Sequence, residues 1–229
     1  MAADPAAWRG PGREPYWPVF LAILVAAFLQ LVTPTVMDVW VDSALFTLLV
    51  LVLLVLMFSS REDGDLVGRH IHTHTPGVRR LSQGLIVLLS LGNLATGAVL
   101  TVQILGRAVD IDAFDLLVNT AAVWATNVIV FALWYWEYDR GGPGHRAEGT
   151  GDEPPAIIFP QMTDPSLGAP DWRPFFFDYL FLSFTNAASF ASADAIPALR
   201  WVKATMMLQA SLSLSLLLLV LSRVAGLLT

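Results

Sequence analysis

The chain of 229 residues contains no cysteine and few charged residues. The absence of cysteine excludes disulfide bonds, thiolate zinc sites and cysteine nucleophiles. Asp, Glu, Lys and Arg make up 14 % of the residues, against about a quarter in ordinary globular proteins. The net charge of −6 argues against a nucleic-acid partner, which would need a basic face. These shortages are not those of an ordinary soluble domain, and they direct attention to the long uncharged runs.

Six apolar runs account for the low charge, and each reaches the roughly 17 residues that a bilayer crossing requires. They cover residues 16–32, 39–58, 83–105, 114–136, 175–193 and 197–228. We therefore predict an all-α fold, a polytopic transmembrane helical bundle of six membrane segments. The expected organisation has four parts: a disordered cytoplasmic arm (1–15), a four-helix membrane region (16–136), a polar linker loop (137–173) and paired C-terminal helices (174–229).

The fifth segment, 175–193, allows two geometries. At 1.5 Å per residue it spans about 28 Å, close to the roughly 30 Å hydrocarbon core, which favours a full crossing. No Gly or Pro interrupts it, whereas a re-entrant loop would need a turn. In a crossing Asp178 and Lys203 lie at opposite ends of the bundle, and in a re-entrant loop they lie on the same side.

The distribution of Lys and Arg predicts the orientation. With six crossings and a cytoplasmic N-terminus, ten basic residues fall inside and three fall outside, at Arg107, Arg200 and Lys203. This satisfies the positive-inside rule and places both termini in the cytoplasm. The outer loops then form an acidic mouth, made of Asp38, Asp42, Asp110, Asp112 and Asp194.

Polar side chains along the last two segments mark a candidate path. Four of them fall within about 60° of one another on a helix, and three more follow an i, i+4, i+8 line on the next. They are Asp178, Thr185, Ser189 and Ser192, and then Thr205, Gln209 and Ser213. Polar groups in hydrocarbon are costly unless they face protein or water. Helix packing without a path is the alternative, and for Asp178 so is an anchoring role at a helix N-terminus.

Other candidate sites are sparse. His70, His72 and His74 alternate, so an extended backbone would place three imidazoles on one side, suited to zinc, nickel or copper. A solvated loop rich in His and Arg is the alternative, and we expect no metal site there. In the third segment Asn93 is expected to hydrogen-bond across a helix contact. No catalytic constellation is recognisable, so neither an enzyme nor a cofactor is expected.

From Trp134 onward the chain resembles a family of uncharacterised bacterial integral membrane proteins, known only as a domain of unknown function. The residues that carry the resemblance are Trp134, Tyr135, Trp136, Gly141, Gly142, Phe159, Pro160, Phe177, Asp178, Tyr179, Leu180, Phe184, Thr185 and Asp194. The resemblance implies a multi-pass protein of the bacterial inner membrane. That family has no assigned activity.

The last two segments are also similar, more weakly, to the pore module of potassium channels. Tyr179, Phe184-Thr185, Asp194, Pro197 and Arg200 follow in the order of a pore helix, a filter and an inner helix. The filter itself is missing, because 186–190 read Asn-Ala-Ala-Ser-Phe, without the glycines that turn carbonyls inward.

Together these patterns predict a cation channel-like or small-solute transport bundle, a homo-oligomer in the lipid bilayer with an inorganic cation as a candidate cargo. The alternative is a non-transporting structural or accessory membrane subunit.

Overall fold

The structure is a computed structural model, and it describes residues 14–15, 17–32, 76–106, 113–148, 154–169, 172–192 and 194–227. Within these ranges the chain is mostly helical, as the sequence predicts, and the exception is one ribbon of two very short strands. The expected segment 39–58, the histidine triplet and four acidic residues of the expected mouth lie outside the described residues; the four are Asp38, Asp42, Asp110 and Asp112.

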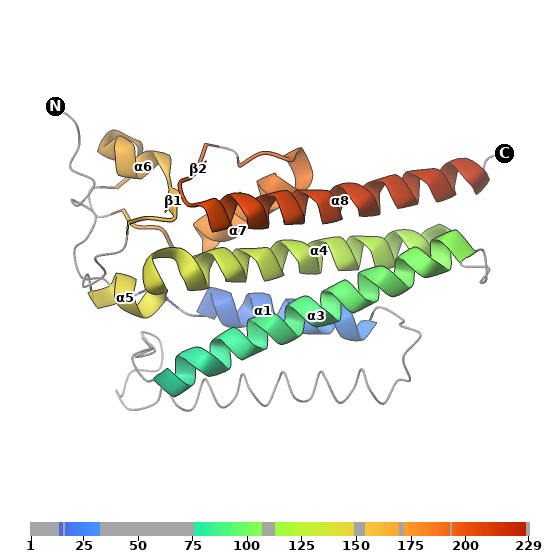
Figure 1. Cartoon of the computed structure of the whole chain (residues 1–229), viewed down its shortest axis with the longest axis horizontal. Helices are drawn as coiled ribbons and strands as arrows, with labels where there is room; N and C mark the ends of the chain where they lie inside the picture. The colour runs from blue at the N-terminus through green and yellow to red at the C-terminus, as the bar shows by residue number, and fades with distance from the viewer. Residues whose placement is uncertain are drawn as a thin grey trace.

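Four long helices run along the bundle (Figure 1). They are α1 (Trp17–Val32), α3 (Pro76–Gly106), α4 (Ala113–Tyr138) and α8 (Arg200–Leu227). Among the described residues α3, α4 and α8 are long and apolar enough to cross a membrane, whereas the apolar stretch of α1 is shorter. These helices are compatible with a membrane location, and the predicted count of six segments is not confirmed.

Helix α4 is the centre of the bundle. In its apolar stretch 67 % of the residues are buried, against 28 % in α3 and 22 % in α8. The outer helices pack on α4 and turn their remaining Leu and Val side chains outward. Such faces suit lipid tails, which are as apolar as leucine.

The expected polar linker, 137–173, is folded against the end of α4 over its described part. It contains η1 (Asp139–Gly141), α5 (Pro143–Glu148), β1 (Ile157–Ile158), α6 (Pro160–Thr163) and η2 (Pro165–Leu167). Helix α4 ends because Arg140, Gly141 and Gly142 have positive φ angles of 53°, 74° and 98°. A Cβ atom on Gly142 would lie 2.8 Å from the carbonyl oxygen of Glu137, so the turn requires glycine there.

Helix α4 ends at the same end of the bundle at which α1, α3, α7 and α8 begin, which we call the junction end (Figure 1). Three contacts made near the end of α4 define it. Arg146 pairs with Glu14, which precedes α1; Glu137 lies near Arg79 of α3; and Asp139 accepts a hydrogen bond from Tyr179 of α7. The chain just before α8 joins them, since Ala198 and Leu199 donate their N–H groups to Ala156 O.

Helix α7 (Phe176–Ser189) enters the bundle at the junction end and the chain returns to that end. Its 14 residues give a length of about 21 Å. Phe184 reaches Trp124, in the middle of α4, with a ring-centroid distance of 5.7 Å. After Phe190 the chain runs back to β2 (Ile196–Pro197), which pairs antiparallel with β1.

The chain of the fifth segment therefore turns back toward the end at which α7 begins, as a re-entrant loop would, although length favoured a crossing. The turn needs neither Gly nor Pro, because Phe190 itself adopts the left-handed conformation, with φ 54° and ψ 31°. A bulky residue seldom does so.

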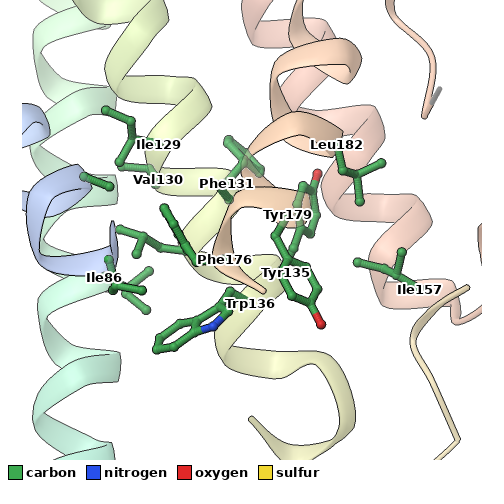
Figure 2. Close-up of a cluster of buried hydrophobic side chains, with 14 of the residues drawn as sticks. Ile86, Ile129, Val130, Phe131, Tyr135, Trp136, Ile157, Phe176, Tyr179 and Leu182 are labelled. Atoms are coloured by element: carbon green, nitrogen blue, oxygen red, sulfur yellow. The ribbon is translucent and has the colours of Figure 1, made fainter. Parts of the chain in front are cut away.

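The main core lies around the second half of α4, near the junction end. Figure 2 shows it formed by Phe131, Tyr135 and Trp136 of α4 with Phe176 and Tyr179 of α7. Phe176 meets the Trp136 ring edge-on at 6.1 Å. This aromatic packing fixes the half-length helix α7 against α4.

Candidate functional site

The junction end holds a buried ion pair between Arg146 and Glu14. Arg146 Nε and Nη2 donate to the two carboxylate oxygens of Glu14 over 2.8 and 3.2 Å, a bidentate arrangement. Arg146 Nη1 donates to the carbonyl oxygens of Trp136 and Asp139, over 2.7 and 2.8 Å. The Trp136 carbonyl lies in the last turn of α4, where carbonyls lack a partner within the helix, and the Asp139 carbonyl lies in η1. Glu14 belongs to the arm that the sequence predicts to be disordered.

The charge of Arg146 is retained despite its burial. Burial alone would lower its pKa, but the carboxylate of Glu14, reinforced by Tyr179 and Asp139, raises the pKa above the usual value. The guanidinium also lies 5.3 Å from the centre of the Tyr179 ring and 5.9 Å from that of Trp136. The cation is thus held by a carboxylate, carbonyls and two aromatic rings.

Asp139 ties the folded linker to α7. Its Oδ1 accepts the Ala156 N–H over 2.8 Å, and its Oδ2 accepts the Tyr179 hydroxyl over 2.7 Å. Trp136 Nε1 donates to Glu14 Oε2 over 2.7 Å. Every carboxylate oxygen of Glu14 and Asp139 therefore accepts a hydrogen bond. The arrangement holds the arm, α4, the linker and α7 together.

A second polar group lies deeper, where α4, α7 and α8 meet. Gln209 Nε2 donates to the backbone oxygen and the hydroxyl of Ser183, and Gln209 Oε1 accepts from Tyr135 and Asn186. All four distances lie between 2.7 and 2.9 Å. Ser183 in turn donates to Val128 O over 2.6 Å. Polar atoms that would be costly in hydrocarbon are thereby satisfied by one another.

The structure does not bring the seven candidate path residues together. Gln209 and Ser213 are buried, and Ser213 accepts a hydrogen bond from Asn127 over 3.2 Å. Thr185 and Thr205 donate to backbone oxygens of their own helices. The other three members face away from that network or lie beyond α7: Asp178 half-buried, Ser189 exposed and Ser192 half-buried. Asp178 Oδ2 accepts the Phe175 N–H over 2.8 Å and so stabilises the start of α7.

The outward face of α7 is aromatic and polar. Phe177, Phe181 and Phe184 are exposed along it, and Ser189 and Phe190 are exposed at its end. The chain between α7 and β2, residues 190–192 and 194–195, is neither helix nor strand; we call it the return segment. Asp194 lies in it, exposed, on the way back to the junction end.

Of the expected acidic mouth, the structure describes Asp194 alone. Asp194 precedes β2, which pairs with β1 near the end of α4.

A cavity of about 450 Å³ opens between α3, α4 and α8. Asn93 of α3 and Asn127 of α4 line it, together with apolar residues of all three helices. The Oδ1 atoms of both asparagines are buried and accept no hydrogen bond from the described residues. Asn93 thus lies at a helix interface, as expected, but its Oδ1 atom makes no hydrogen bond across that interface with the described residues.

Sequence reasoning gave no site role to several residues of these groups, namely Glu14, Tyr135, Arg146, Tyr179, Ser183 and Asn186, and it interpreted Asp139, with Glu137 and Arg140, as an interfacial charge cluster at the end of the fourth segment. One signal was present, since Tyr179, Ser183 and Asn186 follow the i, i+4, i+7 spacing of one helix face. This line competes with the line of Asp178 and Thr185 on the same helix, and only packing against α4 selects between them.

Comparison of the chain with protein-family models, curated proteins and solved structures found no match.

Proposed function

We propose that the chain is an oligomeric integral membrane protein in which the outward face of α7 and the return segment line a path for small cations or small polar solutes. The membrane is taken to be the bacterial inner membrane that the family resemblance implies. The single observation behind the proposal is the return segment itself. Phe184 packs at the middle of α4, so the chain just beyond α7 lies at membrane depth. Irregular backbone at that depth is tolerated only where protein covers it or water fills a cavity.

The topology that supports this proposal has five crossings and one dip. Helices α1 and α3 both begin at the junction end, so the chain between them has to return, and 39–58 is the apolar run available for that crossing. With the junction end in the cytoplasm, eleven of the 13 Lys and Arg residues lie inside and 2 outside, Arg107 and Arg223. A crossing α7 would give ten and three. The re-entrant topology thus improves the charge asymmetry and moves the C-terminus outside.

The chemistry of the outward face favours cations. Helix α7 directs its C-terminal carbonyls, the negative end of its dipole, toward the return segment. The exposed hydroxyl of Ser189, the half-buried hydroxyl of Ser192 and the exposed carboxylate of Asp194 are oxygen groups in the same region. Oxygen groups of this kind replace water around a cation. Copies of the chain arranged around an axis would bring these groups together.

Flux measurement tests the conduction. Purified protein in vesicles is expected to pass potassium or sodium, and a methanethiosulfonate reagent is expected to reduce the flux of the S192C variant. The absence of native cysteine gives no background. S211C, on the exposed face of α8, serves as the matched control and should be unaffected. Flux that is absent for both ions, or equal inhibition of the two variants, would exclude conduction along this face.

Labelling with an impermeant thiol reagent tests the topology separately. We expect T229C and V109C to react in intact cells, and T73C and T150C to be shielded. If T229C were shielded, the C-terminus would lie in the cytoplasm, which would indicate that α7 crosses the membrane fully.

A second candidate function is an accessory subunit, and the aromatic side chains of α7 favour it. Phe177 is 70 % exposed and Phe181 is 56 % exposed on the face in question. Aromatic side chains are enriched in protein interfaces. Under this proposal a partner chain covers the return segment, so S192C would be unreactive toward water-soluble reagents and the vesicles would show no flux.

A further inference from the structure

The cavity between α3, α4 and α8 has the form of a small-molecule site. Helix α4 forms its floor, and α3 and α8 form its walls. Its volume of about 450 Å³ lies within the range of roughly 300–1,000 Å³ that is common for such sites. Leu94, Phe131, Leu208 and Leu212 are among the apolar residues that line it. An occupant therefore has a mainly apolar body.

The hydroxyl groups of the cavity wall are already in use. Ser90, Thr101, Thr205 and Ser215 each donate to a backbone oxygen one turn earlier in their own helix. Ser90 also accepts the indole N–H of Trp134 over 2.9 Å. These side chains leave few polar atoms directed at an occupant.

The two asparagines differ from them. Asn93 is 8 % exposed and Asn127 is 1 % exposed, and the Oδ1 atom of each has no hydrogen-bond partner in the described part of the chain. The Nδ2 atom of Asn127 donates to Ser213, and its Oδ1 atom lacks a donor. If the amide were rotated by half a turn, Nδ2 would take the place of Oδ1 and would lack an acceptor instead. A hydroxyl group satisfies either orientation, since it both donates and accepts.

The depth of the asparagines limits the ligand further. They lie near the middle of the apolar stretches Arg79–Val102 and Phe114–Gly141. Charged lipid headgroups stay at the membrane surface, and acyl chains have no hydrogen-bond donor. Water fits the amides but not the apolar wall.

We propose that this cavity binds an apolar molecule that carries a hydroxyl group, and that the hydroxyl donates to Asn93 Oδ1. The hydroxyl belongs to an isoprenoid alcohol or to a hydroquinone, which share this chemistry. The site is independent of the path along α7, because it lies on the other side of α4 and α8.

The test uses the full chain in detergent, with tritiated farnesol as the first probe and tetramethylhydroquinone as its competitor. Farnesyl methyl ether is the control ligand, because it keeps the apolar body and loses the donor. We expect farnesol or the hydroquinone to bind, and the ether to bind about tenfold more weakly, the effect of one lost hydrogen bond. The concentration of each probe that displaces the other shows whether the site prefers an isoprenoid alcohol or a hydroquinone.

The variants are Asn93→Leu and Asn119→Leu. Asn93→Leu keeps the size of the side chain and removes the acceptor, so the alcohol should bind about tenfold more weakly and lose its advantage over the ether. Asn119 is also a buried asparagine, on α4 outside the cavity lining, and its substitution should leave binding unchanged. Since stability is measured in parallel, a folding defect is distinguished from a binding defect.

Three outcomes would overturn the proposal. The first is that neither probe binds. The second is that the alcohol and the ether bind equally to the parent and to Asn93→Leu. The third is that G97C forms a disulfide with V50C in the ligand-free protein, which would show that segment 39–58 fills the cavity.

Discussion

Where α4, α7 and α8 meet, the amide of Gln209 makes four hydrogen bonds, whereas across α4 the Oδ1 atoms of Asn93 and Asn127 accept none from the described residues. Both regions place amides on helices that are compatible with a membrane location. They differ in what surrounds the amide: on one side a short helix brings in Ser183 and Asn186, and on the other α3 and α8 leave a cavity. A polar side chain in hydrocarbon is therefore no indication of function by itself. Its partners decide whether it stabilises packing or awaits a ligand.

At the junction end every oxygen of the two carboxylates accepts a hydrogen bond, and a substitution there is expected to change stability the most. Arg146→Gln removes the charged partner of the buried Glu14 carboxylate, and breaking such a pair is expected to lower the free energy of unfolding by about 3–5 kcal/mol. Thermal unfolding in mild detergent measures it. Arg80→Gln, at an exposed position of α3, should change stability by less than about 0.5 kcal/mol. Equal effects of the two substitutions would contradict the role given to the ion pair.

The deeper network should respond less strongly. Gln209→Leu leaves Tyr135, Ser183 and Asn186 without a shared partner. Hydrogen bonds between membrane helices average about 0.6 kcal/mol each, so the loss of four should lower the free energy of unfolding by about 2 kcal/mol. Ser211→Leu, exposed on the same helix, is the control. A neutral Gln209→Leu would mean that packing alone holds α7 in place.

Sequence patterns predict the long helices, but they do not predict which buried amides find hydrogen-bond partners. Apolar runs predict α3, α4 and α8 because length and hydropathy are local properties. The dip of α7 depends on partners far along the chain, such as Val128 for Ser183 and Gln209 for Asn186. A non-glycine residue, Phe190, makes the turn, and no local signal marks it.

The same limit applies to the candidate site. Glu14 and Arg146 are 132 residues apart, and Glu14 stands in a stretch whose composition predicts disorder. The linker that carries Arg146 is rich in Gly and Pro, which indicates flexibility when no partner is known. On α7 two polar lines overlap, and the sequence favours the one with the carboxylate. The packing buries the other.

Asp178 tests the exposed side of α7 with a smaller effect. Its carboxylate accepts the Phe175 N–H, so Asp178→Ala should lower the free energy of unfolding by about 0.3–1 kcal/mol, as expected for an acidic group at a helix N-terminus. Asp178→Asn, which retains an acceptor, should have a smaller effect still. Adding Lys203→Met should not restore stability. If it did, the two side chains would form an ion pair, and the local role of Asp178 would be wrong.

The only expected effect of opposite sign, ranging from none to a small gain in stability, is on the cavity side. Asn93→Leu replaces a buried acceptor that lacks a donor by an apolar group of similar size, and such a change is neutral or stabilising. We expect the ligand-free protein to gain up to about 1 kcal/mol in free energy of unfolding, measured beside Gln209→Leu in the same detergent. Added farnesol should then raise the melting temperature of the parent more than that of Asn93→Leu, because a ligand stabilises the folded state more when it binds that state more tightly. If Asn93→Leu were as destabilising as Gln209→Leu, Asn93 would have a partner within the protein, and the two sides of α4 would not differ in the way that the structure indicates.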